Sequence, residues 1–286
     1  MKKSVLITGV SSGIGQDTAS YLLDNGYFVF GSVRTEEDAK KLSQKWSDNF
    51  KPLIFDVQDE LAIDNAVKEV QKVVGDTGLF ALINNAGIAV SGPLKHISLD
   101  RFREQLEINV IGLIRVTQKF LPILGGDLNS PFPPGRIINI SSISGLISNP
   151  FMGPYSASKH AVEAISDALR RELTLYGIKV VTIEPGIVRS EIWNKAKEEK
   201  YEFGSTDYDR FLAKREKIIE GIQKRAIPTR MVSSVIHKAL GSRNPKTRYV
   251  VAKRPWLVKL FAYLLPDKLL DRLILRNMKG DNIRAT

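Results

Sequence analysis

Residues 5–15 read VLITGVSSGIG, a short apolar run followed by a turn that contains three glycines. The apolar run predicts a buried strand, and the pattern from Ile14 onward predicts a helix directly after the turn. Gly9, Gly13 and Gly15 suit a tight turn with a close backbone approach, and the helix presents unpaired N–H groups at its positive end. The stretch therefore predicts a phosphate-binding turn, although a plain strand–helix turn is the alternative for such a segment alone.

Apolar β-rich runs and helical patterns alternate along the rest of the chain. Strands are expected at 5–7, 27–33, 53–55, 79–83, 136–140, 179–183 and 248–252, and helices at 14–25, 36–46, 61–74, 99–121 and 155–176. Strands that alternate with helices of this length indicate right-handed βαβ units. The expected fold class is α/β, a Rossmann-type doubly wound parallel sheet of about seven strands.

The strand–helix pattern continues without a linker, which predicts a single domain over residues 1–254. Residues 190–228 lose the strand rhythm and become charged and aromatic, so we expect an excursion from the sheet that helps to line a substrate pocket. Residues 255–286 are expected to form a C-terminal helical tail. Pro255 and Pro266 predict two short helices there, because proline is tolerated in a first helical turn but not in an interior.

The composition excludes several classes of protein. The chain has 286 residues, of which 43% are hydrophobic and 26% charged, as in globular proteins. The absence of cysteine excludes disulfides, thiolate zinc sites and a cysteine nucleophile, and the three scattered histidines argue against a metal centre. The first residues lack the apolar core of a signal peptide, and no window is apolar enough to span a membrane, so we expect a cytoplasmic protein.

The net charge of +11 is concentrated at the C-terminal end of the chain. From Gly241 onward there are eleven Lys and Arg residues against three Asp, or +8, which leaves +3 for the first 240 residues. Such asymmetry favours an anionic surface as a partner, with a solvated charged face as the alternative. No recognition helix, RNA-binding aromatic motif or zinc finger is present, so no nucleic-acid partner is expected.

Five stretches in order across residues 8–190 resemble the classical short-chain dehydrogenase/reductase family. They are the glycine turn, Asn84-Asn85-Ala86-Gly87 after the fourth strand, Ser142 after the fifth, Tyr155-Ser156-Ala157-Ser158-Lys159 thirteen residues later, and Pro185-Gly186-Ile187-Val188-Arg189-Ser190 after the sixth. The last stretch has serine where the family usually has threonine. Within the family, the likeness extends to 17β-hydroxysteroid and retinol dehydrogenases.

The resemblance implies that Asn109, Ser142, Tyr155 and Lys159 are catalytic. Tyr155 would be the general acid/base, which requires its pKa to fall from ~10 toward neutrality. Lys159 lies one helical turn on and can supply much of the required field, whereas a solvated pair is the alternative for these two residues in isolation. Ser142 would hold the substrate oxygen, which leaves Ser141 to cap the backbone. Asn109 would hold a water that links Lys159 to solvent, or shape a helix kink, or both.

The resemblance also implies a nicotinamide dinucleotide as cofactor and no metal. NADP is favoured over NAD, because Arg34 follows the second strand where an acidic residue would repel a 2′-phosphate. The glycine turn, however, lacks the second basic residue of many NADP-using relatives, since Ser11 donates only a neutral hydrogen bond. The residues expected to bind the cofactor are Gly9, Ser11, Ser12, Gly13, Ile14, Gly15, Arg34, Asp56, Val57, Asn85, Ala86, Gly87, Tyr155, Lys159, Pro185, Gly186, Val188 and Ser190.

The expected function is therefore an NADP-dependent oxidoreductase that interconverts an alcohol and its ketone or aldehyde. A dinucleotide-binding sensor of the same fold is the alternative, although such sensors typically lack the Tyr–Lys pair. A lipophilic substrate is favoured by apolar residues expected near the pocket, which could equally belong to the core: Leu146, Ile147, Phe151, Met152, Trp193, Phe203 and Phe211. The family usually forms homodimers or homotetramers.

The C-terminal tail combines apolar and basic residues. The run from Trp256 to Leu265 is too short to span a bilayer, but an aromatic-rich segment beside Lys and Arg can lie in the interface of an anionic membrane. Packing of the tail over the pocket or on a second subunit is the other possibility, and the sequence favours it slightly. Peripheral membrane contact is thus a secondary expectation.

Overall fold

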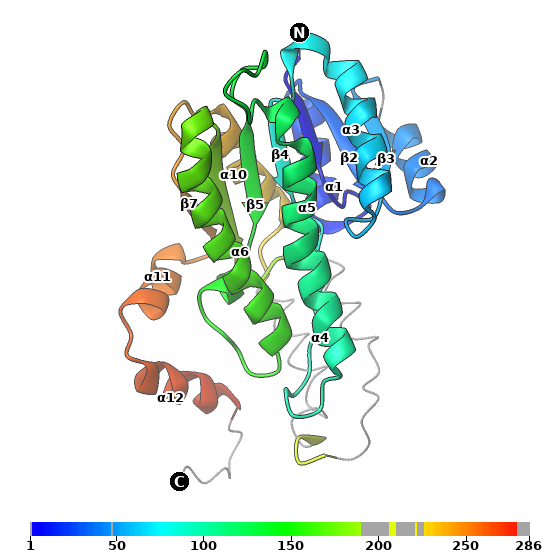
Figure 1. The fold of residues 1–286 in the computed structure, drawn as a ribbon. Helices are drawn as coiled ribbons and strands as arrows, with labels where there is room; N and C mark the ends of the chain where they lie inside the picture. Colours follow the sequence, from blue (N-terminus) through cyan, green and yellow to red (C-terminus); the bar gives the residue numbers. More distant parts are fainter. Residues whose placement is uncertain (1, 47, 190–205, 210–220, 222–225, 279–286) are drawn as a thin grey trace.

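The computed structural model describes residues 2–46, 48–189, 206–209, 221 and 226–278. Within them a parallel sheet of seven strands runs in the order β3-β2-β1-β4-β5-β6-β7 (Figure 1). The strands are β1 (Ser4–Ile7), β2 (Phe28–Val33), β3 (Phe50–Ile54), β4 (Ala81–Asn84), β5 (Arg136–Ile140), β6 (Lys179–Pro185) and β7 (Arg248–Val251). The predicted doubly wound α/β fold is confirmed, with the reversal of strand order between β1 and β4.

Helices cover both faces of the sheet (Figure 1). The α-helices of the described residues are α1 (Gly13–Asp24), α2 (Glu36–Lys45), α3 (Glu60–Val74), α4 (Leu99–Leu106), α5 (Gly112–Phe120), α6 (Gly153–Glu172), α10 (Thr229–Gly241), α11 (Pro255–Tyr263) and α12 (Asp267–Met278). One core cluster joins the sheet to α1, α2 and α10, and a second joins it to α3, α5 and the end of α6. Residues 5–7 of β1 are all apolar because both faces of the sheet are covered: Val5 and Ile7 belong to the first cluster, and Leu6 belongs to the second.

Two predicted elements differ from the structure. The third strand begins at Phe50 rather than residue 53 and includes Pro52, which an edge strand tolerates because one side of its backbone needs no partner. The helix expected over 99–121 is instead α4 and α5 joined by a π-helical turn, Glu107–Ile111. At the start of α5, a Cβ on Gly112 would lie 2.6 Å from Val57 Cγ2, so the helix approaches the loop after β3 closely.

The C-terminal helices lie at the β7 edge of the sheet, where α11 contacts β7. In Figure 1, α11 (orange) follows β7, and α12 (red) extends outside the two helical layers, toward the same end of the molecule as α4. The two predicted short helices of the tail are thereby confirmed, with Pro255 as the first residue of α11. None of the helices in the described part of the chain is long and apolar enough to cross a membrane.

Candidate active site

The glycine turn after β1 is held at the carboxyl edge of the sheet. Gly9 and Gly13 have φ of +72° and +61°, a left-handed conformation that favours glycine. Ser32 at the end of β2 ties the turn down, because its hydroxyl oxygen accepts a hydrogen bond from Gly9 N at 2.9 Å and its carbonyl accepts one from Val10 N at 3.0 Å. A Cβ on Gly15 would lie 2.1 Å from the Gly9 carbonyl oxygen, so α1 begins directly against the turn.

The loop after β4 braces the same turn from the other side. The Asn85 side-chain amide donates to the carbonyl oxygens of Thr8, at 2.8 Å, and Gly9, at 3.0 Å. In return the Thr8 hydroxyl accepts hydrogen bonds from the backbone N–H groups of Asn85 and Ala86. The Asn85 side chain, predicted beside the adenosine ribose, is thus engaged in shaping the turn. Thr8 has a structural role that sequence reasoning missed, although it stands inside the quoted stretch.

Other predicted cofactor residues begin α1 or follow the strands β2 and β3. Ser12 caps α1 without a side-chain hydrogen bond, and the first turn of α1 has no acidic residue, so its free N–H groups can face an anion. Arg34 is exposed directly after β2. Asp56 accepts a hydrogen bond from Gln58 N at 2.9 Å after β3. The close approach at Gly15 and the uncovered positive end of α1 fit a dinucleotide phosphate.

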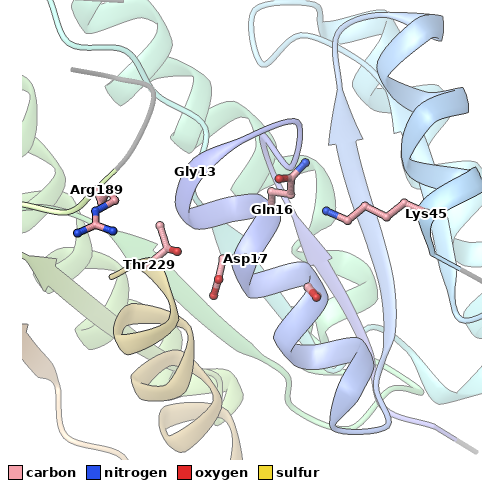
Figure 2. Close-up of a pocket in the computed structure, with 7 residues that line it drawn as sticks. Gly13, Gln16, Asp17, Lys45, Arg189 and Thr229 are labelled. Atoms are coloured by element: carbon pink, nitrogen blue, oxygen red, sulfur yellow. The ribbon is translucent and has the colours of Figure 1, made fainter. Parts of the chain in front are cut away.

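A cavity of about 290 Å³ borders the first turn of α1. Figure 2 shows α1 running between Lys45 on one side and Arg189 and Thr229 on the other. Gly13, Gln16 and Asp17 of α1 and the neighbouring Ser20 complete the lining. The cavity therefore adjoins the glycine turn and lies on the α1 side of the sheet.

Two of the predicted catalytic residues lie on one face of α6. Lys159 is buried, and its Nζ donates to the carbonyl oxygen of Ile140, the last residue of β5, at 2.8 Å. Its Nζ lies 5.7 Å from the centre of the Tyr155 ring. Ser142, two residues after β5, hydrogen-bonds the Tyr155 side chain and also accepts from Ser144 N at 3.1 Å. Ser142, Tyr155 and Lys159 are therefore brought together as predicted.

The pKa values at this site differ from the expectation. Burial raises the pKa of the Tyr155 phenol, and the hydrogen bond with Ser142 only partly opposes it. Burial also lowers the pKa of Lys159 to about 8, against the opposing effect of the Glu163 carboxylate. The Tyr155 pKa is thus raised, opposite to the predicted fall toward neutrality, because desolvation of the phenol outweighs the hydrogen bond with Ser142 that stabilises its anion.

Asn109 lies in the π-helical turn between α4 and α5. Its Oδ1 accepts from Ile88 N at 2.9 Å, and its Nδ2 donates to Ile88 O at 3.0 Å and to Ser158 Oγ at 3.1 Å. The π-helical turn agrees with the helix-kink alternative for Asn109, and such turns are frequent at functional sites. Gly87 lies against the same amide, since its Cβ would stand 3.1 Å from Asn109 Oδ1.

The two segments after β5 and β6 complete the site. The Ser141 hydroxyl is buried without a hydrogen-bond partner among the described residues, so its predicted capping role is wrong. Gly186 N donates to Val251 O at 2.9 Å, and the buried Val188 pairs with Ile227. Ser190, predicted to hold the nicotinamide carboxamide, lies outside the described residues.

An aromatic wall forms where the expected substrate side of the site lies. Tyr208 packs edge-on against Phe151, with ring centres 5.8 Å apart, and against His96 at 5.9 Å. Phe151 has φ of +65°, an unusual value for a residue with a side chain. Tyr208 belongs to the predicted excursion, whereas Trp193, Phe203 and Phe211 lie outside the described residues. Among the residues described, no cluster of side chains could hold a metal ion.

Comparison with known proteins identifies the family. A model of the short chain dehydrogenases matches residues 3–201. The chain belongs to the short-chain dehydrogenase family. This short-chain dehydrogenase is therefore an oxidoreductase of CH–OH and carbonyl groups, as predicted from its motifs.

Three relatives and one solved structure illustrate the likeness. The chain is 44% identical to an NADPH-dependent 3-dehydrocapnine reductase of Ornithobacterium rhinotracheale over 96% of both chains. It is 34% identical to 17-beta-hydroxysteroid dehydrogenase type 6 of Bos taurus, over 96% of this chain and 88% of that one. Retinol dehydrogenase 16 of Mus musculus is 35% identical, over 95% of this chain and 87% of that one. ElxO with NADP bound superposes with a TM-score of 0.73 at 27% identity, over 90% of this chain and 100% of that one. The predicted likeness to hydroxysteroid and retinol dehydrogenases is confirmed.

Proposed function

We propose that this enzyme uses NADPH to reduce the carbonyl group of a lipophilic substrate, with Tyr155 as the proton donor. The observation that carries the proposal is the convergence of Ser142, Tyr155 and Lys159 after β5, at the carboxyl edge of the sheet where the glycine turn follows β1. The bound cofactor supplies the hydride. The complete set of side chains argues against the alternative of a sensor without turnover.

In the proposed reduction, Tyr155 is protonated before it meets the substrate. Because burial raises its pKa, the phenol stays protonated at neutral pH and can donate to a substrate oxygen that gains negative charge. Ser142 is hydrogen-bonded to Tyr155 and can bind the same oxygen. The Lys159 ammonium, 5.7 Å from the Tyr155 ring centre, then stabilises the phenolate that remains.

NADP is the proposed cofactor, and Arg34 is the residue proposed to select it. Its guanidinium is exposed after β2, beside the turn that Ser32 anchors. A guanidinium suits the 2′-phosphate that distinguishes NADP from NAD. An NADPH-dependent relative and an NADP-bound structural neighbour support the assignment.

The substrate is proposed to be lipophilic because aromatic side chains border the site. Phe151 and Tyr208 present their rings to each other beside the segment that follows Ser142. The name of the 44% identical relative makes 3-dehydrocapnine the first carbonyl compound to assay.

Replacement of Tyr155 by phenylalanine tests the mechanism. Tyr155→Phe is expected to lower kcat by about 10²–10⁴-fold, the usual contribution of general acid catalysis, while NADPH affinity changes little. Tyr176→Phe, at the end of the same helical stretch, is the matched control and should keep full activity. Full turnover by Tyr155→Phe would contradict the mechanism, and NADPH binding without turnover of any carbonyl by the wild type would favour the sensor.

The enzyme is proposed to be cytoplasmic, with its C-terminal tail in contact with an anionic lipid surface. No described residue of α11 is buried, and Trp256, Tyr263 and Leu264 are 63%, 60% and 74% exposed. The sequence slightly favoured packing of the tail over the pocket or on a second subunit. The exposure and the net charge of +3 over residues 255–286, six Lys and Arg against three Asp, favour lipid instead, because a two-fold contact between tails would bring like charges together.

Vesicle flotation tests the tail. The full-length protein should float with vesicles containing phosphatidylglycerol at low salt and dissociate at high salt. The double variant Trp256→Ser/Leu264→Ser should lose flotation, whereas Leu128→Ser, which changes an equally exposed leucine elsewhere, should not. Absence of flotation by the wild type at low salt would refute the contact. A homodimer or homotetramer stays a prediction that sedimentation can test.

A further inference from the structure

A cluster of charged side chains lies one helical turn beyond Lys159. Glu163 and Asp167 follow Lys159 on the same face of α6, and Arg248 of β7 reaches both of them. Arg248 Nε lies 3.0 Å from Glu163 Oε2, and its other nitrogen lies 2.9 Å from Asp167 Oδ1. Glu184 of β6, which is only 1% exposed, lies 3.4 Å from Arg248 Nε. Elements far apart in the sequence thus enclose these carboxyl groups.

Arg248 does not donate a hydrogen bond to every carboxylate oxygen in this cluster. Oε1 of Glu163 and Oε1 of Glu184 are buried without a hydrogen-bond partner among the described residues. A buried carboxylate is costly unless a cation or hydrogen-bond donors compensate it. Burial and the neighbouring Glu163 raise the pKa of Glu184 to about 7, while Arg248 and Lys259 oppose the shift. Of the carboxylates in this cluster, Glu163 is the one whose charge acts on Lys159, one helical turn before it on α6.

Apart from Glu163, little in the described structure stabilises the charged form of the buried Lys159 side chain. Its hydrogen-bond partner, the Ile140 carbonyl, carries only a partial charge. Burial lowers the pKa of Lys159, and the Glu163 carboxylate opposes that effect. Without Glu163 a larger fraction of Lys159 would be neutral near pH 8, and a neutral amine stabilises a phenolate poorly.

We propose that Glu163 is a positioning residue for carbonyl reduction, whose carboxylate, held by Arg248, keeps the buried Lys159 ammonium charged beside Tyr155. The proposal rests on the proposed function, because it concerns the charge that stabilises the Tyr155 anion. It assigns a task to a buried acid that touches neither the substrate nor the cofactor in the mechanism above.

Several other titratable or charged groups face this cluster and set the background for its titration. They are Tyr155, Asp167 and Arg170 on α6, Glu184 on β6, Arg248 on β7, and Lys259 and Tyr263 on α11. Only Glu163 raises the pKa of Lys159 among the causes of its shift, so a change at Glu163 should act on Lys159 most directly.

The first test is the titration of Lys159 itself in the cofactor-free protein. NMR of protein labelled with [ε-¹³C]lysine follows its midpoint, and the signal missing from Lys159→Met assigns it. Glu163→Gln should move the midpoint down by about one pH unit, as expected for loss of one nearby buried charge. Glu163→Asp, which keeps the negative charge, should leave the Lys159 midpoint close to its wild-type value. A midpoint unchanged in Glu163→Gln overturns the proposal whether or not the enzyme turns over.

The second test is the pH profile of kcat with NADPH and a reducible carbonyl. Glu163→Gln should lose about tenfold at pH 8.5 and much less at pH 6, because the fraction of charged Lys159 falls only on the alkaline side. Asp167→Asn is the matched control: it removes another carboxylate bonded to Arg248 and should leave the profile in place. Uniform loss at every pH in Glu163→Gln would show a purely structural role.

Arg248→Gln extends the test if Glu163→Gln fails to fold. Removing the guanidinium takes away the donor that holds the buried Glu163 carboxylate, so Glu163 should move or gain a proton and the Lys159 midpoint should move to lower pH, as in the first variant. An upward or absent shift would overturn the proposal. Turnover lacking in every variant and in the wild type, with the NMR shifts as expected, would refute the proposed function and leave the Glu163–Lys159 coupling intact.

Discussion

Replacing Gly15 with alanine would place a methyl group where the structure has no room for one. The added Cβ would stand 2.1 Å from the Gly9 carbonyl oxygen and 2.4 Å from Asn85 Nδ2. Neither atom can retreat easily, because Gly9 belongs to the anchored turn and the Asn85 amide is bonded to two carbonyls of that turn. The start of α1 must therefore move away from the turn.

Two opposing effects set the size of the change. Alanine in place of glycine favours the helix by roughly 0.5–1 kcal/mol. Overpacking against rigid neighbours costs about 1–3 kcal/mol, and losing one of the Asn85 hydrogen bonds costs about 1 kcal/mol more. The net loss of about 2 kcal/mol should lower Tm by about 4–8 °C. Displacement of the helix N–H groups should weaken NADPH binding by at least about tenfold.

Thermal unfolding and NADPH fluorescence titration measure both effects in the same preparation. Gly241→Ala is the matched control, because a Cβ on that glycine at the end of α10 meets no atom within 4 Å. The control should bind NADPH as the wild type does and unfold at a similar temperature. Gly15→Ala with wild-type affinity and an unchanged or higher Tm would refute the close approach of α1 to the turn.

Three further changes test other parts of the molecule. Arg34→Asp should weaken NADPH binding by roughly ten- to a hundredfold, about 1.5–3 kcal/mol, and favour NADH. An unchanged ratio of NADPH affinity to NADH affinity in titrations would show that Arg34 does not contact the 2′-phosphate. Lys159→Met should abolish activity yet raise the free energy of unfolding at pH 7 by about 2 kcal/mol. Burial lowers the pKa of Lys159 to about 8, so its buried ammonium destabilises the fold below pH 8, and the variant removes that cost. This gain allows for the loss of the hydrogen bond from Lys159 to the Ile140 carbonyl. That gain should shrink as pH rises from 8 toward 10.5, because the folded lysine loses its proton first, and urea unfolding at pH 7 and pH 10 should show the difference. Asn139→Leu should destabilise the fold by about 2–4 kcal/mol in urea unfolding, because it leaves the buried Asn84 amide without the 2.9 Å bond to Asn139 Oδ1, and a loss below 0.5 kcal/mol would contradict this reasoning.

The strand–helix order and much of the active site could be predicted from the sequence. Both faces of the sheet are covered, so β1 is apolar at consecutive positions and stands out from the polar turn that follows it. The four-residue spacing of Tyr155 and Lys159 places them on one helical face in any regular helix, and their contact was predictable for that reason. Ser142 was predictable from the resemblance in motif spacing, since the carboxyl ends of parallel strands meet at one edge.

Other features required contacts between distant segments. The helix expected over 99–121 is interrupted at Glu107–Ile111, where the Asn109 amide pairs with the backbone of Ile88, a partner no local pattern reveals. The strand containing Pro52 was misplaced because its edge position, which tolerates proline, depends on the order of strands in the sheet. The bracing role of Asn85 likewise depends on β1 and β4 being neighbours.

The sequence alone determined which segments are strands and helices and which side chains share a helical turn, because hydrophobic periodicity and short spacings act within a few residues. Only the tertiary structure decided how strongly each group is desolvated and which charges surround it. Lys159 is buried against β5, with Glu163 held by Arg248 from a strand 85 residues away in sequence. Burial and long-range charge control the pKa values of Tyr155 and Lys159, and both depend on which surfaces meet when the whole chain has folded.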